Sequence, residues 1–347
     1  MKKYLFILTI MLCFNTAYSQ VLYSENFDNF NWGYLGTDPT GKIPGQGGWL
    51  IKSNATQSNT FFTIVNEPNR GKVLDITAMS HAEGLYAIKT GIDQLISNRT
   101  PGNDVIKFEI DYFTGPKQPN PQSKSWIKLL RVGEIEGGAI NPVYLCASIT
   151  YKDSGIHTIG AAGMDGKNVL LPFNTWIKII TYLDYTNRKA YFEIPSLNIV
   201  HGSDFLTNVT STNLIQDYKP ATISLNTYFF ETPDQPKVIT RNKYDNIQIT
   251  ALKEVPPNVI ALSTNEQLAT KFNLYPNPAT NVVNITNAEN MQVNQITVYT
   301  LAGKQVSTQA YNNPTEIQLN VEHLASGTYL LYLQTAQGTA VKQFIKK

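Results

Sequence analysis

Two acidic residues in this sequence have the type and spacing that could perform chemistry on a sugar. Glu109 and Asp111 lie in the alternating segment 105–112, so both carboxyl groups should lie on one face of a strand. In the hydrolysis of a glycosidic bond, one of two adjacent carboxyl groups can act as the nucleophile while the other lies beside it on the same face of the strand. The simpler interpretation is a half-solvated strand in which Lys107 and Glu109 point outwards. Its apolar face would consist of Ile106, Phe108, Ile110 and Tyr112.

The four tryptophans could provide rings that stack on sugars. Trp126 and Trp176 lie in apolar strand patterns, which predicts that both belong to a core. Trp32 and Trp49 lie in or beside the glycine-rich segment 31–48, where a side chain is more easily exposed. Trp32 and Trp49 are therefore the candidate carbohydrate-binding residues.

Other common catalytic sites lack support in the sequence. The four histidines are scattered, without the spacing of metal ligands. The sequence has no Gly-x-Ser-x-Gly motif and no phosphate-binding loop, so serine hydrolase and nucleotide chemistry are not supported. Cys146 lies in an apolar run, and we expect it to be a small buried hydrophobic residue.

Short strands are the elements that must position these side chains. Residues 176–183 and 190–194 alternate on either side of a polar turn, which predicts a hairpin. Residues 222–228 and 246–250 follow the same rule, and residues 91–96 are the one candidate for a short helix. This density of strands from residue 20 to residue 252 predicts an all-β sandwich of two sheets, of the jelly-roll kind.

The first 19 residues have the layout of a cleavable signal peptide. Two lysines precede an apolar run at residues 4–14, which is too short to span a bilayer as a permanent helix. Ala17 and Ser19 place small residues at the −3 and −1 positions. We therefore expect cleavage between Ser19 and Gln20.

The charge balance of the mature chain excludes two classes of partner. Removal of residues 1–19 leaves 26 basic and 26 acidic side chains, with no basic cluster. A neutral chain of this kind is not expected to bind nucleic acid or an anionic membrane surface. No other apolar run approaches 18 residues, so we expect no transmembrane segment.

A second unit follows the first along the chain. Residues 253–270 begin with a Pro-Pro pair and lack strand periodicity, so we expect a linker. Residues 271–347 show short strands separated by turn pairs, which predicts a small immunoglobulin-like β-sandwich. The expected strands are Val282–Thr286, Gln295–Thr300, Lys304–Gln309, Glu316–Val321, Gly327–Gln334 and Ala340–Ile345.

Three motifs occur in a fixed order in this second unit. Residues 274–278 read LYPNP, residues 296–304 read ITVYTLAGK, residues 324–331 read LASGTYLL, and the chain ends with two lysines. Together they resemble the type A C-terminal sorting domain of the type IX secretion system of Bacteroidetes. The resemblance implies export through the periplasm, with the type IX secretion machinery as partner. It also implies a secreted or cell-surface product from which the tail is usually removed.

Residues 20–252 carry weaker markers of a family. They open with Glu25-Asn26-Phe27-Asp28, contain FNTWIKI around Trp176, and close with Tyr244-Asp245-Asn246-Ile247. They loosely resemble concanavalin A-like lectin and glucanase sandwiches, in which the first and last strands pair and nearby acids often hold a structural calcium ion. The resemblance makes Glu25, Asp28 and Asp245 candidate metal ligands, since calcium prefers oxygen. Alternatively, these acids cap turns and face water.

The same resemblance bears on Glu109 and Asp111. Some retaining glucanases of this fold carry Glu-x-Asp-x-x-Glu, or a variant with one more residue, and the last Glu donates the proton. Thr114 and Gly115 stand at those positions here. We therefore expect no catalytic residue and a cargo domain that binds a polysaccharide or surface glycan, or acts in adhesion. The alternatives are a secreted polysaccharide-degrading enzyme (glycoside hydrolase or lyase) with an unrecognised site, and a purely structural surface protein.

Overall fold

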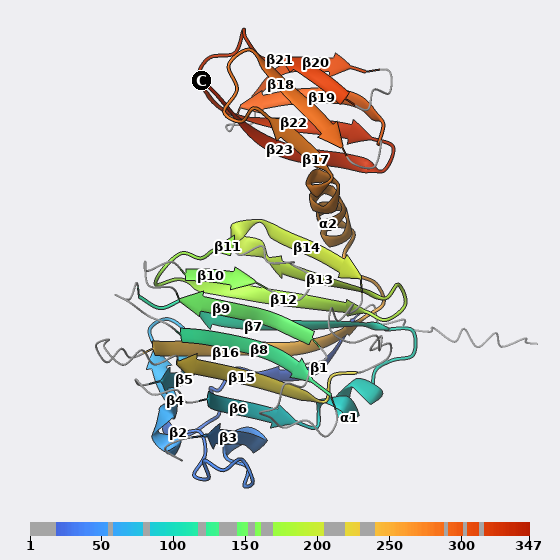
Figure 1. Ribbon diagram of the computed structural model, residues 1–347. Helices are drawn as coiled ribbons and strands as arrows, with labels where there is room; N and C mark the ends of the chain where they lie inside the picture. Colours follow the sequence, from blue (N-terminus) through green and yellow to red (C-terminus); the bar gives the residue numbers. More distant parts are fainter. Residues whose placement is uncertain are drawn as a thin grey trace, which may run out of the picture.

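The computed structural model contains two β-sandwiches that follow one another along the chain, joined by helix α2 (Pro257–Thr270) (Figure 1). We call residues 19–252 the N-terminal sandwich and residues 271–347 the C-terminal sandwich. The predicted signal peptide up to residue 18 lies outside the described residues. The structure describes residues 19–54, 58–78, 84–116, 123–131, 144–151, 157–160, 169–204, 219–229, 240–287, 291–300, 304–311 and 316–347.

Sheet A of the N-terminal sandwich has nine strands, in the order β14-β13-β12-β7-β16-β5-β4-β2, and β1 also pairs with β16. The first and last strands of this sandwich therefore lie side by side, with Glu25 opposite Ile247. The strands are β1 (Ser19–Glu25), β2 (Gly33–Tyr34), β4 (Phe62–Glu67), β5 (Gly71–Ala78), β7 (Val105–Phe113), β12 (Trp176–Asp184), β13 (Lys189–Ile194), β14 (Ile199–Asp204) and β16 (Thr240–Leu252).

Sheet B has seven strands, in the order β11-β10-β9-β8-β15-β6-β3. They are β3 (Trp49–Ser53), β6 (Gly84–Thr90), β8 (Ser123–Leu130), β9 (Tyr144–Tyr151), β10 (His157–Gly160), β11 (Val169–Leu170) and β15 (Thr222–Phe229). The short helix α1 (Ile92–Ser97) follows β6. The described residues of this sandwich also contain the 3₁₀ turns Gln46–Gly48, Asn59–Phe61 and Pro195–Leu197.

The core of the N-terminal sandwich lies between the two sheets and follows from the alternation of their strands. Phe108 and Ile110 of β7 are fully buried in it, as are Ile223 and Leu225 of β15. Each such side chain stabilises the fold by about 1.5–3 kcal/mol relative to an exposed position. Because successive side chains of a strand alternate, the residues between them lie on the outer faces of the sheets.

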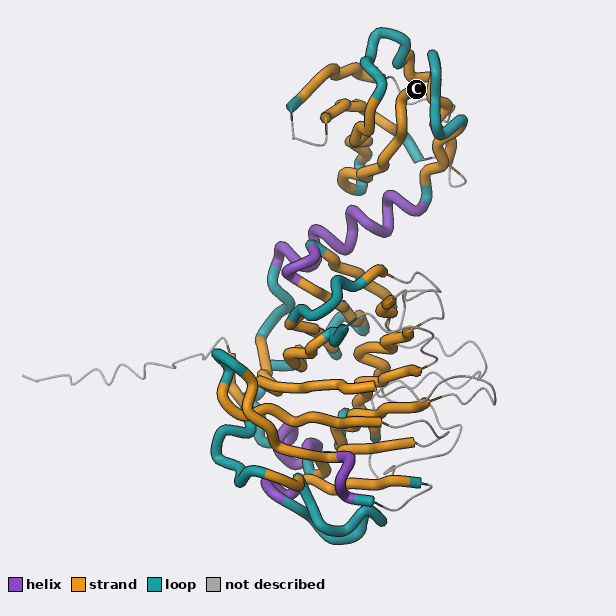
Figure 2. Tube along the Cα trace, turned by 90° about the vertical axis from the view of Figure 1, so that its left-hand side faces the viewer, coloured by secondary structure: helices purple, strands orange, loops and turns teal. Residues whose placement is uncertain are grey.

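Helix α2 packs against both sandwiches. Val255, just before the helix, and Val259 join an apolar cluster on the outer face of sheet A. Ser263 lies against β14, where a Cβ on Gly202 would come within 3.0 Å of its side chain, so this close approach favours glycine. Leu268, near the other end of the helix, belongs to the core of the C-terminal sandwich. Figure 2 shows the helix between the two units.

The C-terminal sandwich consists of a three-stranded sheet, β17-β18-β21, and a four-stranded sheet, β20-β19-β22-β23. Its core contains alternate residues of these strands, among them Val283, Ile317, Leu331 and Phe344. The strands are β17 (Phe272–Tyr275), β18 (Val282–Asn287), β19 (Val293–Thr300), β20 (Gln305–Ala310), β21 (Glu316–Asn320), β22 (Gly327–Thr335) and β23 (Gly338–Lys346).

The predicted fold class is confirmed: a jelly-roll sandwich of antiparallel sheets is followed by a small β-sandwich. The predicted short helix at residues 91–96 is α1. The segment expected to be a linker, residues 253–270, contains a helix of more than three turns. The sequence did not predict this helix because the segment has no continuous apolar stripe. A few residues that pack against the two sandwiches stabilise α2 instead.

Candidate functional site

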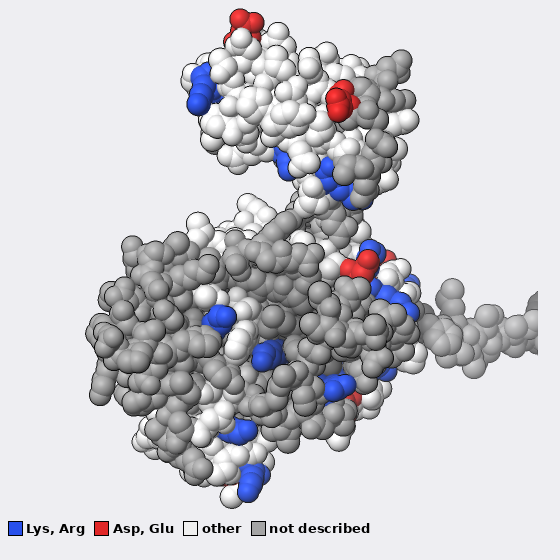
Figure 3. All heavy atoms as spheres, in the orientation of Figure 1, with Lys and Arg blue, Asp and Glu red and all other residues white. Residues whose placement is uncertain are grey.

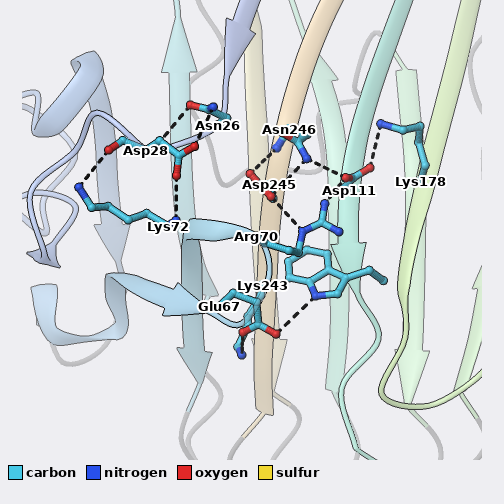
Figure 4. A network of polar contacts seen from close by, with 11 residues as sticks. Asn26, Asp28, Glu67, Arg70, Lys72, Asp111, Lys178, Lys243, Asp245 and Asn246 are labelled. Atoms are coloured by element: carbon cyan, nitrogen blue, oxygen red, sulfur yellow. Dashed lines mark hydrogen bonds and ion pairs between the residues drawn. The ribbon is translucent and has the colours of Figure 1, made fainter.

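The outer face of sheet A carries a cluster of charged residues around Arg70. Asp111 of β7 lies directly opposite Lys178 of β12 on one side and Asp245 of β16 on the other, and paired residues share a face. Arg70 reaches this row from the turn between β4 and β5. Figure 4 shows these four residues together with Asn246. We call these five residues the Arg70 cluster.

Arg70 bridges two carboxylates that belong to different strands. Its Nε donates a hydrogen bond of 3.0 Å to Oδ2 of Asp245, and its Nη2 donates to Oδ2 of Asp111. The guanidinium group also lies 4.1 Å from the ring centre of Trp176, a cation–π contact. Lys178 places its Nζ 2.9 Å from Oδ1 of Asp111, so both oxygens of that carboxylate have a cationic partner.

A bulge in β16 adds further donors to the cluster. The register of β16 against β7 shifts between Asp245 and Gln248, and Asn246 has a φ of 48°. The Asn246 side chain donates to Asp111 (2.9 Å), and its backbone N–H donates to Asp245 (2.8 Å). Burial raises the pKa of Asp245. Burial acts the same way on Asp111, but hydrogen bonds from Asn246 and Lys178 outweigh it and lower the pKa of Asp111.

These contacts bear on the role of the acid pair Glu109 and Asp111 of β7. Glu109 lies 2.5 Å from the Nζ of Lys107 and 3.5 Å from that of Lys178, so both acids of β7 are paired with cations. Position 114 holds a buried threonine whose hydroxyl group donates to the carbonyl of Thr175. Each carboxylate of the Arg70 cluster has a cationic partner, which is the arrangement of a structural network rather than of an acid–base pair.

A second region of interest is the exposed aromatic segment at the edge of sheet A. Trp32 is 58% exposed and Tyr34, in the edge strand β2, is 50% exposed. The Nζ of Lys72 lies 5.3 Å from the ring centre of Trp32 and donates to the carbonyls of Asp28 and Phe30. We call Trp32 and Tyr34 the aromatic platform.

Gln46 fixes the backbone under the aromatic platform. Its side chain accepts a hydrogen bond from the N–H of Asn31 (2.6 Å) and donates to the carbonyls of Asn31 (3.0 Å) and Tyr34 (2.9 Å). A single glutamine thus supports both ends of the segment that carries the two rings. A backbone held in this way loses little conformational entropy when a ligand binds to the rings that it carries.

The predictions for the other tryptophans need correction. Trp49 is fully buried against Phe27, at 6.0 Å between ring centres, so it cannot offer a face to a sugar. Its position at the start of β3 points it into the core. Trp176 and Trp126 were expected in the core, but both lie on outer faces and are partly exposed. Trp176 donates to Glu67 (3.4 Å), and Trp126 donates to Ser148 (3.0 Å).

The three candidate calcium ligands lie at the paired first and last strands, but their oxygens already have donors. Glu25 accepts from the N–H of Phe27 (2.9 Å), and burial raises its pKa. Asp28 accepts from the N–H of Lys72 (2.9 Å) and from Asn26 (3.1 Å), while Asp245 binds Arg70. Figure 4 shows Asp28 and Asp245 in two separate groups.

At least one carboxylate oxygen of each of Glu25, Asp28 and Asp245 already accepts a hydrogen bond from a protein group, so a calcium ion would compete with these donors. Within the described ranges, no group of three or more His, Cys, Asp or Glu residues could hold a metal ion. The calcium site stays a prediction from the resemblance, and no step of the proposed function depends on it. The predicted cleavage between Ser19 and Gln20 also stays a prediction; both residues belong to β1.

Two aspartates of the N-terminal sandwich, Asp75 and Asp38, should affect stability with opposite signs. Burial raises the pKa of Asp75, so its ionisation weakens the fold as pH rises. Hydrogen bonds from Thr40, Ile43 and Lys42 lower the pKa of Asp38 to about 2, so its stabilising effect is present at neutral pH and lost in acid.

We expect Asp75→Asn to raise the free energy of unfolding at pH 7, with a smaller gain at pH 3, where the wild-type carboxyl group is protonated. Asp38→Asn should lower that free energy at pH 7 and have less effect at pH 3. Urea unfolding of both variants at the two pH values measures this. A loss of stability in Asp75→Asn at pH 7 would contradict the assignment of burial as the dominant effect on Asp75.

The C-terminal sandwich identifies the class of protein. It contains the LYPNP segment at its start and the two lysines at its end, in a compact seven-stranded fold. Residues 273–347 match the family described as the secretion system C-terminal sorting domain. The protein is thus exported to the cell surface or secreted. In the described part of the chain, α1 and α2 lack the length and apolar character needed to cross a membrane.

Other comparisons give little about the N-terminal sandwich. No curated protein matches the sequence. Similar solved structures include the lectin UEA-II complexed with galactose (9% identity, TM-score 0.34, covering 66% of this chain and 99% of that chain). A botulinum neurotoxin serotype C1 binding domain is 8% identical (TM-score 0.37, covering 90% and 73%). A sialidase is 14% identical (TM-score 0.35, 63% of this chain), and this chain spans only 18% of its length. These likenesses are too weak to indicate a function.

Proposed function

We propose that the exported N-terminal sandwich binds a glycan outside the cell, through the aromatic platform of Trp32 and Tyr34. The observation that carries this proposal is that Trp32 is 58% exposed, with the Nζ of Lys72 5.3 Å from its ring centre. An indole ring exposed to this extent presents a flat apolar face to the C–H groups of a sugar ring.

The charges of the Arg70 cluster favour a neutral ligand beside it. Figure 3 shows a face of the molecule on whose described part the Lys and Arg side chains of the N-terminal sandwich lie apart from one another, with few acidic side chains among them. In the Arg70 cluster, the positive charges face acidic partners, which leaves little net charge there. A neutral, hydroxyl-rich ligand is compatible with this balance of charge in the Arg70 cluster.

We expect Trp32→Ala to weaken glycan binding by at least about tenfold, the effect of losing a contact worth about 1.4 kcal/mol or more. Tyr34→Ala should have a smaller effect in the same direction, and Trp32→Phe should retain much of the affinity. A glycan array selects the ligand, and titration calorimetry of the selected oligosaccharide measures the affinity. The matched control is Ile43→Ala, which removes an apolar side chain that is 63% exposed in the same segment but has no ring.

The same samples separate binding from degradation. A binding protein leaves the selected oligosaccharide intact, whereas a hydrolase or lyase releases new reducing ends or unsaturated products. Equal affinity of the wild type and Trp32→Ala would contradict the aromatic platform. Degradation of the oligosaccharide would replace the binding proposal by the enzymatic alternative.

A further inference from the structure

The aromatic platform lies at an open edge of the N-terminal sandwich. Among the described strands, β2 is the last strand of sheet A, and it pairs only with β4. Figure 1 shows β2 at the end of this sandwich that is farthest from α2. Residues 31–34 are all exposed. A ligand that lies across the two rings therefore meets no further strand of sheet A beyond β2 in the described part of the chain.

The core holds both ends of this exposed segment. Phe30 is 8% exposed and Leu35 is fully buried, and both belong to the core of the N-terminal sandwich. The N–H of Leu35 donates to the carbonyl of Phe62 (2.9 Å). Trp32 and Tyr34 lie between these anchors and are separated by one residue, so their Cα atoms are at most about 7 Å apart. This distance is close to the length that one sugar unit adds to a glycan chain.

Polar backbone groups on both sides of the rings have partners within the protein. Gln46 binds the N–H and the carbonyl of Asn31 and the carbonyl of Tyr34. Lys72 donates to the carbonyl of Phe30 (2.6 Å). The ring faces are then the groups that this segment offers to a ligand. Stacking on a ring face uses C–H groups that every unit of a chain has, whereas recognition of a chain end uses hydroxyl groups that only the last unit has.

We propose that the aromatic platform binds an internal stretch of a linear glycan, with two consecutive sugar units stacked on Trp32 and Tyr34. This inference rests on the proposed glycan binding and names the class of glycan. A flat, unbranched chain can lie across both rings and continue past them at both ends. Recognition of a terminal unit would require a pocket that encloses that unit, whereas Trp32 and Tyr34 are 58% and 50% exposed.

The test measures affinity as a function of glycan length. The sequence of sugars that the glycan array selects is prepared from the monosaccharide to the tetrasaccharide, together with a tetrasaccharide whose terminal units are both capped by O-methyl groups. Titration calorimetry gives the affinity of each probe for the full chain. The variants are Trp32→Ala, Tyr34→Ala and Tyr34→Phe, and Ile43→Ala is the matched control.

We expect the affinity of the wild type to rise by about tenfold from the monosaccharide to the disaccharide, because the second ring gains a partner, and to change little with further length. Tyr34→Ala should remove this rise and leave the affinity for the monosaccharide unchanged. Tyr34→Phe keeps a ring at this position, and it should keep the rise, as should Ile43→Ala. The capped tetrasaccharide should bind as tightly as the uncapped one.

Three results would overturn this inference while Trp32→Ala still weakens binding, so that the proposed function stands. They are equal affinity for the monosaccharide and the disaccharide, a rise that persists in Tyr34→Ala, and loss of binding when the terminal units are capped. Equal affinity of the wild type and Trp32→Ala for every probe would instead contradict glycan binding through the platform, and this inference with it.

Discussion

Deletion of residues 271–347 is expected to abolish export and leave the remaining protein in the periplasm. The deletion removes the entire region that matches the sorting-domain family, residues 273–347. It leaves the N-terminal sandwich and α2 intact, including the contacts of Val259 and Ser263 with sheet A. Immunoblots of periplasm, cell surface and medium measure the effect, and the full-length chain is the reference.

The deletion variant should remain folded, which separates a sorting defect from degradation. The two sandwiches have separate cores, and a unit with its own core can fold alone. We therefore expect residues 20–270, produced alone, to unfold cooperatively on heating. Full-length levels of the deletion variant in the medium would show that the C-terminal sandwich does not direct export.

Replacement of Arg70 by alanine should destabilise the N-terminal sandwich by about 3 kcal/mol. Loss of one member of a buried ion pair costs roughly 3–5 kcal/mol, and the lower end applies because 21% of the Arg70 side chain is exposed. The variant leaves Asp245, whose side chain is only 3% exposed, without its cation. It also removes the cation–π contact with Trp176.

The ion pair between Lys189 and Asp204 provides the control for Arg70→Ala. It has a similar length, 3.0 Å, but its side chains are 43% and 78% exposed. Water screens such a pair, so Lys189→Ala should cost at most about 1 kcal/mol. Urea unfolding of both variants measures the difference. Equal losses in the two variants would mean that the Arg70 cluster contributes no more than a surface contact.

Local patterns in the sequence were sufficient to predict some of the strands, among them β7, β12, β13 and β15. The alternation in residues 105–112 placed Phe108 and Ile110 in the core, and the structure confirms this for β7. The order of motifs in the last part of the chain was sufficient to predict the sorting domain, since those motifs lie within one compact unit.

The Arg70 cluster could not be predicted in the same way. Arg70 contacts Asp111 and Asp245, which are 41 and 175 residues away in the sequence, so no local pattern relates them. Trp176 shows a related difficulty. Its strand, β12, is apolar on both faces because Val255 and Val259 cover part of the outer face. A strand with a continuous apolar sequence does not indicate which of its two faces is exposed.

The packing of α2 against both sandwiches has a mechanical consequence for any force that acts on the C-terminal sandwich. Traction on the C-terminal sandwich travels along the chain through α2 to β16, a strand paired on both sides in sheet A. Before such a force acts on β16, it must break the packing contacts of Val259 and Ser263 with sheet A. The first turns of the helix therefore protect the pairing of β16 in sheet A from a force applied to the C-terminal sandwich.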